Sequence, residues 1–307
     1  MKLIDLHCDT LYKSVTQNLP LDDISYETKI ASKCDNRIQC YAIWLPDDLD
    51  SDSAEKLFFT AAKRLKNECE RCKIKLINSF TEIRSEFYNK PNNAVFTVEN
   101  GLALNGKLEN IRKFAQLGVR IMTLTWNSHN HIGDGAGVEN PKGITSFGKQ
   151  AVTEMEKNGI ISDVSHASDK LFFDVAEITT RPFVATHSDS RAVTPHKRNL
   201  TNEQFNIIKA NKGLAGLNFH KDFLNSNPDN ASIYDVLRHA EYFLSLGGED
   251  ILAIGSDFDG CCLPNDISGS ECMDDLFELF LKHNYPESLV NKIFYKNALN
   301  FFENFDI

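Results

Sequence analysis

Residues 2–9 read Lys2-Leu3-Ile4-Asp5-Leu6-His7-Cys8-Asp9, a short apolar run that ends in an imidazole and a carboxylate. Side chains alternate between the two faces of a strand, so His7 and Asp9 are predicted to point to the same side of a sheet. A strand end that aims these two groups together supplies half of a metal site. The other half has to come from the ends of later strands.

Seven further runs share the length and the β-branched or aromatic content of the first. Between them lie stretches with the 3.6-residue apolar period of amphipathic helices. Repeated alternation of strand and helix is typical of parallel βαβ units, and eight units close most naturally into a (β/α)8 TIM barrel. The predicted strands are 2–6, 38–45, 94–98, 119–126, 160–164, 183–186, 214–219 and 251–256, and the predicted helices are 53–73, 108–117, 147–157, 171–178, 203–210 and 233–246.

An open, doubly wound parallel sheet is the alternative to this α/β barrel. The first strand is not followed by G-x-G-x-x-G, which argues against a dinucleotide-binding version of that sheet. No low-complexity linker divides the sequence, so we expect residues 1–307 to form a single domain. Residues 10–37 and 263–272 are predicted to be irregular excursions around the barrel mouth.

Composition excludes several classes of partner. Hydrophobic residues make up 42 % and charged residues 25 % of the chain, which is ordinary for a globular protein. The net charge of −10, with no block of Lys and Arg, argues against nucleic acid. We recognise no signal peptide, lipid-anchor signal or run near the ~18 apolar residues of a membrane span. We therefore expect a cytoplasmic protein with no membrane partner.

Side chains of the types that bind metals follow five of the eight predicted strands. Active sites of such barrels are built at the C-terminal ends of the strands. Any one of these residues alone is more often a hydrogen-bonded structural residue, but their coincidence at one face indicates a metal centre. They are His7 and Asp9 after the first strand, Glu99 after the third, His166 after the fifth, His187 after the sixth and Asp257 after the eighth.

Imidazole and carboxylate ligands suit Zn²⁺, with Mn²⁺ and Co²⁺ as substitutes. Five ligands exceed what one catalytic zinc needs, and they fit two ions that share a carboxylate about 3.5–4 Å apart around a bridging hydroxide. Glu99, alone on its strand, is the expected bridge between two Zn²⁺ per chain. Asp257 is then the expected acid/base, taking the proton of the attacking water and passing it to the leaving amine.

Together these motifs resemble the membrane dipeptidase family (renal dipeptidase-like, peptidase family M19), a branch of the amidohydrolase-like metal-dependent hydrolases. The resemblance runs in the family's order along essentially the whole chain. It is carried by Asp5-Leu6-His7-Cys8-Asp9-Thr10, Val98-Glu99-Asn100-Gly101, Thr123-Leu124-Thr125-Trp126-Asn127, Asp163-Val164-Ser165-His166, Thr186-His187-Ser188, Arg198-Asn199 and Gly255-Ser256-Asp257-Phe258-Asp259-Gly260.

The resemblance implies a binuclear zinc dipeptidase. His7 and Asp9 would bind one ion, His166 and His187 the other, and Glu99 would bridge them. Asp257 matches the family's acid/base position, and Arg198 matches the residue that grips the C-terminal carboxylate of a dipeptide, for which a guanidinium is suited. The resemblance also implies tolerance of a C-terminal D-residue and a homodimer.

The chain departs from the family pattern at two positions. Mammalian members carry a His after the Leu-Thr of the fourth strand, where this chain has Trp126. They also carry a Tyr past the seventh strand, where it has Phe223. The substrate preference therefore stays open, whereas the metal ligands are unchanged.

Two other readings remain. The first is another hydrolase on the same barrel, such as a cyclic amidase, deaminase or lactonase. Those relatives often bridge their metals with a modified Lys, and no Lys ends the third or fourth strand here. The second is a non-catalytic metal- or peptide-binding protein, which would lack an acid/base such as Asp257.

Of the remaining histidines, His129 and His131 are placed near the rim of the pocket, and His239 is expected to face solvent on a helix.

Overall fold

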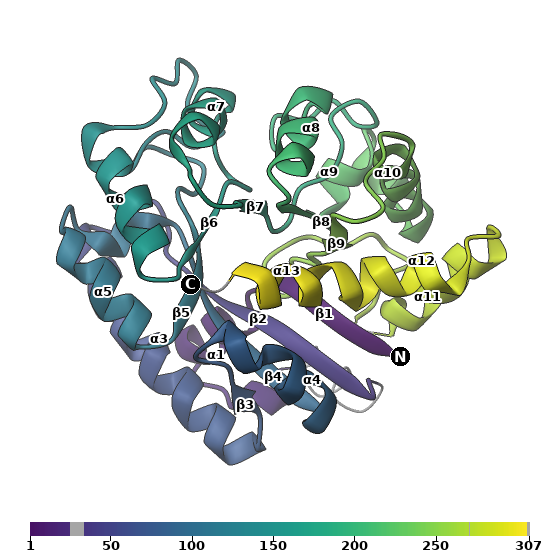
Figure 1. The fold of residues 1–307 in the computed structure, drawn as a ribbon, viewed down its shortest axis with the longest axis horizontal. Coiled ribbons are helices and arrows are strands. Elements are labelled where there is room, and N and C mark those ends of the chain that lie inside the picture. Colours follow the sequence, from purple (N-terminus) through teal and green to yellow (C-terminus); the bar gives the residue numbers. More distant parts are fainter. Residues whose placement is uncertain (25–33, 270, 306–307) are drawn as a thin grey trace.

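The computed structural model describes residues 1–24, 34–269 and 271–305, and in them eight parallel strands close into a barrel (Figure 1). The barrel closes because β2 pairs with both β1 and β4. A further short strand, β3, extends the part of β4 that β5 does not reach. The strands are β1 (Lys2–Cys8), β2 (Asn36–Trp44), β3 (Lys75–Leu76), β4 (Asn92–Glu99), β5 (Val119–Thr123), β6 (Ile161–Asp163), β7 (Val184–Ala185), β8 (Leu214–Leu217) and β9 (Leu252–Ile254).

Helices surround the barrel, and α13 crosses its N-terminal end (Figure 1). The α-helices are α1 (Thr10–Thr16), α3 (Ser51–Cys72), α4 (Ile83–Asn89), α5 (Leu108–Gln116), α6 (Ser146–Lys157), α7 (Asp169–Ile178), α8 (Asn202–Ala210), α9 (Lys221–Leu224), α10 (Ile233–Ser245), α11 (Cys272–Lys282), α12 (Glu287–Asn291) and α13 (Asn297–Phe305). Short helical turns are η1 (Leu21–Asp23), η2 (Phe80–Glu82), η3 (Gly101–Leu104), η4 (Pro228–Asn230) and the π-helical η5 (Lys292–Lys296).

Both faces of the strands are buried, which explains why they are apolar runs rather than alternating patterns. One cluster fills the barrel interior with side chains from every strand except β3, and aromatic side chains of α13 close it from below. A larger cluster packs the outer face of the strands against the helices. The interior is therefore filled by side chains, as is usual for barrels of this type.

The eight predicted strands and six predicted helices are all present, with ends shifted by a few residues. Local signals fixed several of these ends. Thr201 caps α8 in a reciprocal capping box with Gln204, and the Ser168 side chain accepts from the backbone N–H of Leu171 at the start of α7.

One prediction about irregular structure was wrong. Residues 10–37 contain α1, η1 and the start of β2, while 25–33 lie outside the described residues. The apolar Leu11 and the Ser14 hydroxyl of α1 are buried against the barrel, so packing rather than local propensity holds this short helix. The stretch 263–272 is irregular where it is described, up to the start of α11.

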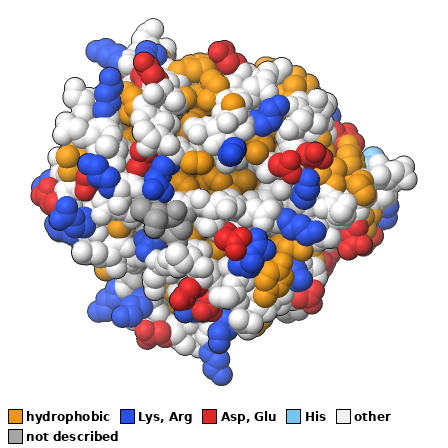
Figure 2. All heavy atoms as spheres, in the orientation of Figure 1, with side chains coloured by type: hydrophobic (Ala, Val, Ile, Leu, Met, Phe, Trp, Pro, Cys, Tyr) orange, Lys and Arg blue, Asp and Glu red, His pale blue; other side chains and the backbone are white. Residues whose placement is uncertain are grey.

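Charged side chains of both signs are mixed on the surface of the protein. On the face in Figure 2, Lys and Arg side chains are interspersed with Asp and Glu rather than gathered into one basic patch. In the described part of the chain, no helix combines the length and apolar character that crossing a bilayer requires.

His239 was expected to face solvent on its helix, and that expectation was wrong. The ring is fully buried in α10. Its Nδ1 accepts from the backbone N–H of Ser190 at 3.0 Å, and its Nε2 lies 3.0 Å from the carbonyl of Leu224. Both ring nitrogens are therefore occupied by loops above β7 and β8, and burial lowers the pKa of His239 from 6.5 to about 4.

This burial predicts a pH-dependent stability. Between pH 6.5 and 4 the unfolded chain protonates His239 while the folded protein does not, so stability is lost as pH falls through that window. The full effect is about 3 kcal/mol. Urea unfolding at pH 7.5, 5.5 and 4.5 should show the wild type losing more stability than the His239→Gln variant. Equal losses in the two proteins would contradict the prediction.

Candidate metal centre

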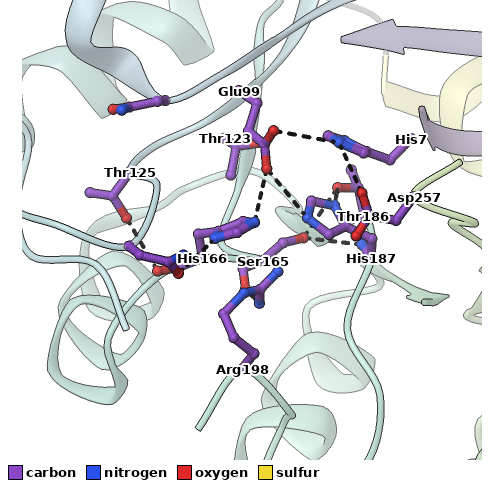
Figure 3. Close-up of polar contacts among 12 residues, drawn as sticks. His7, Glu99, Thr123, Thr125, Ser165, His166, Thr186, His187, Arg198 and Asp257 are labelled. Carbon is purple, nitrogen blue, oxygen red and sulfur yellow. Dashed lines mark hydrogen bonds and ion pairs between the residues drawn. The ribbon is translucent and has the colours of Figure 1, made fainter. Parts of the chain in front are cut away.

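The six residues predicted for the metal centre converge at the C-terminal mouth of the barrel (Figure 3). His7 and Glu99 lie in the last residues of β1 and β4, and His166, His187 and Asp257 lie in the loops that follow β6, β7 and β9. Asp9 directly precedes α1, and its side chain makes no capping hydrogen bond to that helix. All six are buried. Residues separated by up to 250 positions in the sequence thus line one small volume.

A register shift in β1 aims His7 at this volume. Asp5 pairs with Gln39 and Cys8 with Tyr41, so three steps along β1 match two along β2. Such a bulge re-aims the following side chain. Leu6 packs in the barrel interior, and His7, directly after it, still faces Glu99. The prediction that His7 and Asp9 meet was correct, but the bulge and the start of α1 bring them together, not a regular strand.

Glu99 lies between two groups of ligand-type side chains. Its Oε2 is 3.7 Å from His7 Nε2, which in turn is 3.4 Å from Asp9 Oδ2. Its Oε1 is 2.8 Å from His166 Nε2 and 3.6 Å from His187 Nε2. One carboxylate oxygen therefore faces His7, which lies next to Asp9, and the other faces His166 and His187, as a bridging carboxylate would require.

Several polar atoms of this cluster have no hydrogen-bond partner among the described residues. They are His7 Nε2, Asp9 Oδ1 and His187 Nε2, all inaccessible to water. Leaving a buried polar atom unpartnered costs about 1–3 kcal/mol, so such atoms need an explanation. His7, Glu99 and His187 offer ligand atoms within 4.8 Å of one another, as do His7, Asp9 and Asp257. The residues therefore fit a divalent cation.

The electrostatics favour positive charge at the centre. Burial lowers the pKa values of His166 and His187 well below normal, which keeps their lone pairs free. Burial alone would also lower the pKa of His7, but the charges of Glu99, Asp9 and Asp257 raise it to about 10. The acidic groups thus favour positive charge beside His7 Nε2, while burial raises the pKa of Glu99 well above its usual value.

Partners in the loops orient two of the imidazoles. His166 Nδ1 lies 3.1 Å from Asn127 Oδ1. His187 Nδ1 lies 2.8 Å from the hydroxyl of Thr186, which donates to Asp163 at 2.7 Å and so accepts from the ring. Both rings therefore carry their proton on Nδ1 and turn Nε2 toward Glu99. The sequence motifs contain Asn127, Thr186 and Asp163, but spacing alone assigned them no role.

Asp257 belongs to a loop that is tied to the first strand. Its Oδ2 accepts from Asn218 Nδ2 at 3.1 Å, and its Oδ1 lies 4.0 Å from His7 Nε2. The backbone N–H of Asp257 donates to the carbonyl of His7, and that of Asp9 donates to the carbonyl of Phe258. These bonds hold Asp257 at φ +61°, a region that non-glycine residues rarely adopt.

Gly260 is a functional position that the sequence reasoning missed. A β-carbon there would overlap Asp9 Oδ2 and lie 2.8 Å from Asp257 Oδ1. The close approach of the backbone to two carboxylates therefore requires glycine. The only sequence signal was its place at the end of the Asp257-Phe258-Asp259-Gly260 motif.

Gly260→Ala is expected to lower catalytic efficiency by about 10–100-fold, because a shift of about 1 Å in either carboxylate spoils the geometry. Gly247→Ala is the control. It also introduces a β-carbon, but one in ordinary contact with Lys209 Nζ at 3.5 Å and at φ +77°, so it should cost about 1–2 kcal/mol of stability and no activity. Paired measurements of kcat/KM and urea unfolding check both, and a fully active Gly260→Ala variant would contradict the assignment.

Arg198 lies beside the centre in the segment between β7 and α8. Its Nη1 donates to the carbonyl of Ser165, and its guanidinium lies 5.2 Å from the ring centre of Phe223. Its Nε and Nη2 have no partner among the described residues although they are buried. Burial lowers the pKa of Arg198 to about 10, so the group stays charged at neutral pH. Two donors are therefore available to an anionic ligand.

A cavity of about 290 Å³ opens above these residues. Asp9, Glu99, His166 and Asp257 form its floor, and Arg198 lies in its wall. Such a volume is at the small end of ligand pockets, which suits a short peptide.

Comparison with known proteins agrees with this geometry. The family model described as membrane dipeptidase (peptidase family M19) matches residues 1–306. A Klebsiella pneumoniae protein named as an uncharacterized protein in the pqqA 5′ region is 30 % identical over 216 residues, covering 67 % of this chain and 80 % of that protein. Dipeptidase aclJ of Aspergillus oryzae is 31 % identical over 188 residues, covering 60 % of this chain and 44 % of that protein. The chain thus spans less than half the length of the fungal relative.

Solved structures extend the match to the whole fold. The metallopeptidase dipeptidase AC, of family M19, superposes with a TM-score of 0.90 at 26 % identity, covering 99 % of this chain and 98 % of that one. A Rhodobacter sphaeroides metallopeptidase bound to a phosphinate mimic of L-Ala-D-Ala also has a TM-score of 0.90, at 25 % identity and 99 % coverage of both chains.

Proposed function

This chain belongs to the membrane dipeptidase family, peptidase family M19, and from that premise we propose that it is a binuclear zinc dipeptidase. Its substrates would be free dipeptides, including those with a C-terminal D-residue. The observation that carries the binuclear assignment is the division of the two Glu99 oxygens between the His7–Asp9 pair and the His166–His187 pair. The L-Ala-D-Ala mimic bound to the similar Rhodobacter enzyme supports the choice of substrate.

In this proposal His7 and Asp9 hold one ion, His166 and His187 hold the other, and Glu99 holds both. Two such ions, when bound, supply a water of lowered pKa and polarise the scissile carbonyl. Asn127 and Thr186 keep the Nε2 lone pairs of their imidazoles aimed at the centre. These side chains are fixed before substrate arrives, so little reorganisation is needed.

Asp257 moves the proton. It lies in the cavity, hydrogen-bonded through Oδ2 to Asn218, which leaves Oδ1 facing the centre. It would accept the proton of the attacking water and deliver it to the amine that leaves when the peptide bond breaks. The amide of Asn218 holds the carboxylate in place through both transfers.

Arg198 would bind the free C-terminal carboxylate through its two unpartnered nitrogens. Arg198→Lys keeps a positive charge but loses the two parallel N–H donors of the guanidinium, so KM for the dipeptide should rise by about tenfold or more. Wild-type enzyme should discriminate strongly against the C-terminal amide of the same dipeptide, and the variant should discriminate far less. Unchanged discrimination would show that the carboxylate binds elsewhere.

The assay that tests the function uses the purified full chain loaded with zinc and a panel of L-L and L-D dipeptides. We expect hydrolysis that a chelator abolishes and that zinc restores. Tripeptides and carboxyl-blocked dipeptides should be poor substrates. If the protein cleaves no dipeptide but does hydrolyse a cyclic amide or a lactone, it is another amidohydrolase-type hydrolase and not a dipeptidase.

Some finer points stay predictions from the sequence. They are zinc rather than Mn²⁺ or Co²⁺, two ions per chain, residues 1–307 as one domain, a cytoplasmic location and a homodimer. Elemental analysis of the purified protein tests the metal and its stoichiometry, and sedimentation tests the dimer.

A further inference from the structure

We propose that Tyr12, Trp44 and Trp126 form a wall that selects the N-terminal residue of the substrate, favouring a large apolar or aromatic side chain there. This inference rests on the proposed dipeptidase function and deepens it. It assigns a role to Trp126, one of the two positions where the chain departs from the mammalian members of the family.

The three rings form a continuous series that reaches the metal centre. The ring centres of Tyr12 and Trp44 are 5.0 Å apart, and so are those of Trp44 and Trp126. Trp126 in turn lies 5.9 Å from the ring of His166. The planes are tilted or edge-on, as aromatic pairs prefer. We refer to Tyr12, Trp44 and Trp126 as the aromatic wall.

The aromatic wall lies across the mouth from Arg198. Around the barrel the strands follow the order β1, β2, β4, β5, β6, β7, β8, β9, and the wall comes from the ends of β1, β2 and β5. Arg198 follows β7, and Phe223 follows β8 on the opposite side. All of these residues line the same cavity. The cavity therefore has an end for an anionic ligand at Arg198 and an aromatic end, and Glu99 also lines it.

This layout orients a dipeptide. Its carboxylate is held at Arg198 and its peptide bond lies over the centre, so its first residue extends toward the wall. The three rings offer apolar surface to a side chain placed there, beside the polar Thr16 and Gln17 that line the same cavity. Burial of apolar surface on such faces is favourable in proportion to the area covered.

The charges at this end do not favour a charged side chain. Lys13 lines the same end of the cavity, but its Nζ lies 3.0 Å from Asp259 Oδ1. Asp259 also accepts from the hydroxyl of Thr10 at 2.7 Å. The two opposite charges neutralise each other, which leaves the ring faces as the dominant feature for recognition.

The test compares kcat/KM for Gly-Ala, Leu-Ala and Phe-Ala on the zinc-loaded enzyme. We expect Phe-Ala to exceed Gly-Ala by about tenfold or more, with Leu-Ala between them. Trp126→Ala and Trp44→Leu should each reduce that ratio toward one. Tyr234→Ala is the matched control, because Tyr234 is an aromatic residue on α10 with 60 % of its surface exposed, and its ratio should equal that of the wild type.

The outcomes separate the two proposals. If the wild type cleaves Gly-Ala as well as Phe-Ala, the wall does not select the first residue, although the enzyme is still a dipeptidase. The same conclusion follows if Lys-Ala or Asp-Ala is preferred, or if both tryptophan variants keep the wild-type ratio. If the wild type cleaves none of these dipeptides, the proposed function itself fails. If the Trp126→Ala variant does not fold, the ratio of kcat/KM values for Phe-Ala and Gly-Ala in the Trp44→Leu variant decides whether the wall selects the first residue.

Discussion

Asp257→Asn is expected to lower kcat by roughly 100- to 10,000-fold while the protein keeps its full complement of metal. The asparagine side chain has nearly the same shape and can still bond to Asn218, but it cannot accept a proton from water. The change removes a proton carrier and leaves the five other buried groups untouched. Steady-state kinetics and elemental analysis of the same preparation measure both quantities.

Metal content is the readout that distinguishes the roles open to this residue. Asp257 Oδ1 lies 4.0 Å from His7 Nε2, close enough for Asp257 to be considered a ligand. If Asp257→Asn loses metal in proportion to activity, Asp257 is a ligand and the proton carrier must be sought elsewhere. Asp250→Asn, at a side chain that is 74 % exposed and paired with Lys292, is the matched control and should keep both activity and metal.

Glu99→Gln is expected to have the second large effect, a loss of metal from two ions per chain to one or fewer and a fall in kcat/KM of roughly 1,000-fold or more. The amide keeps one oxygen but replaces the other with an NH2 group, which cannot ligate. Because the two oxygens of Glu99 face different histidines, one substitution weakens both halves of the site. Elemental analysis after gel filtration measures the stoichiometry.

The outcome against this prediction is a Glu99→Gln variant that retains two ions. It would mean that Glu99 is a hydrogen-bonded neighbour of the histidines rather than their shared ligand. Glu203→Gln, at an exposed position in α8, controls for the loss of one carboxylate from the chain. It should change neither metal content nor activity.

The fold and the convergence of the ligand-type side chains could be predicted, because both depend on repeated local patterns. Apolar runs at regular spacing specify parallel strands, and parallel strands in a barrel all end at the same face. Glu99, His166 and His187 each follow such a run directly. Their convergence could therefore be predicted without knowledge of packing. It follows from the number of strands and from the fact that parallel strands of a barrel all end at one face.

Other features depend on contacts between distant segments, and sequence periodicity does not contain them. The bulge in β1 exists only relative to its pairing with β2. His239 lies on the buried face of α10 with Val236 and Phe243, and the groups that contact its two ring nitrogens come from segments of two other units. Gly260 is required only because the carboxylates of Asp9 and Asp257 come close to it.

The first and last strands of the barrel are neighbours, and the loop after β9 is hydrogen-bonded to the end of β1. A nascent chain leaving the ribosome exposes His7 long before Asp257 has been synthesised. An incomplete chain offers an incoming ion only scattered imidazoles and acids, with none of the enclosure that makes them a site. The cluster of ligand-type side chains is therefore complete only after the loop that follows β9 has joined the end of β1.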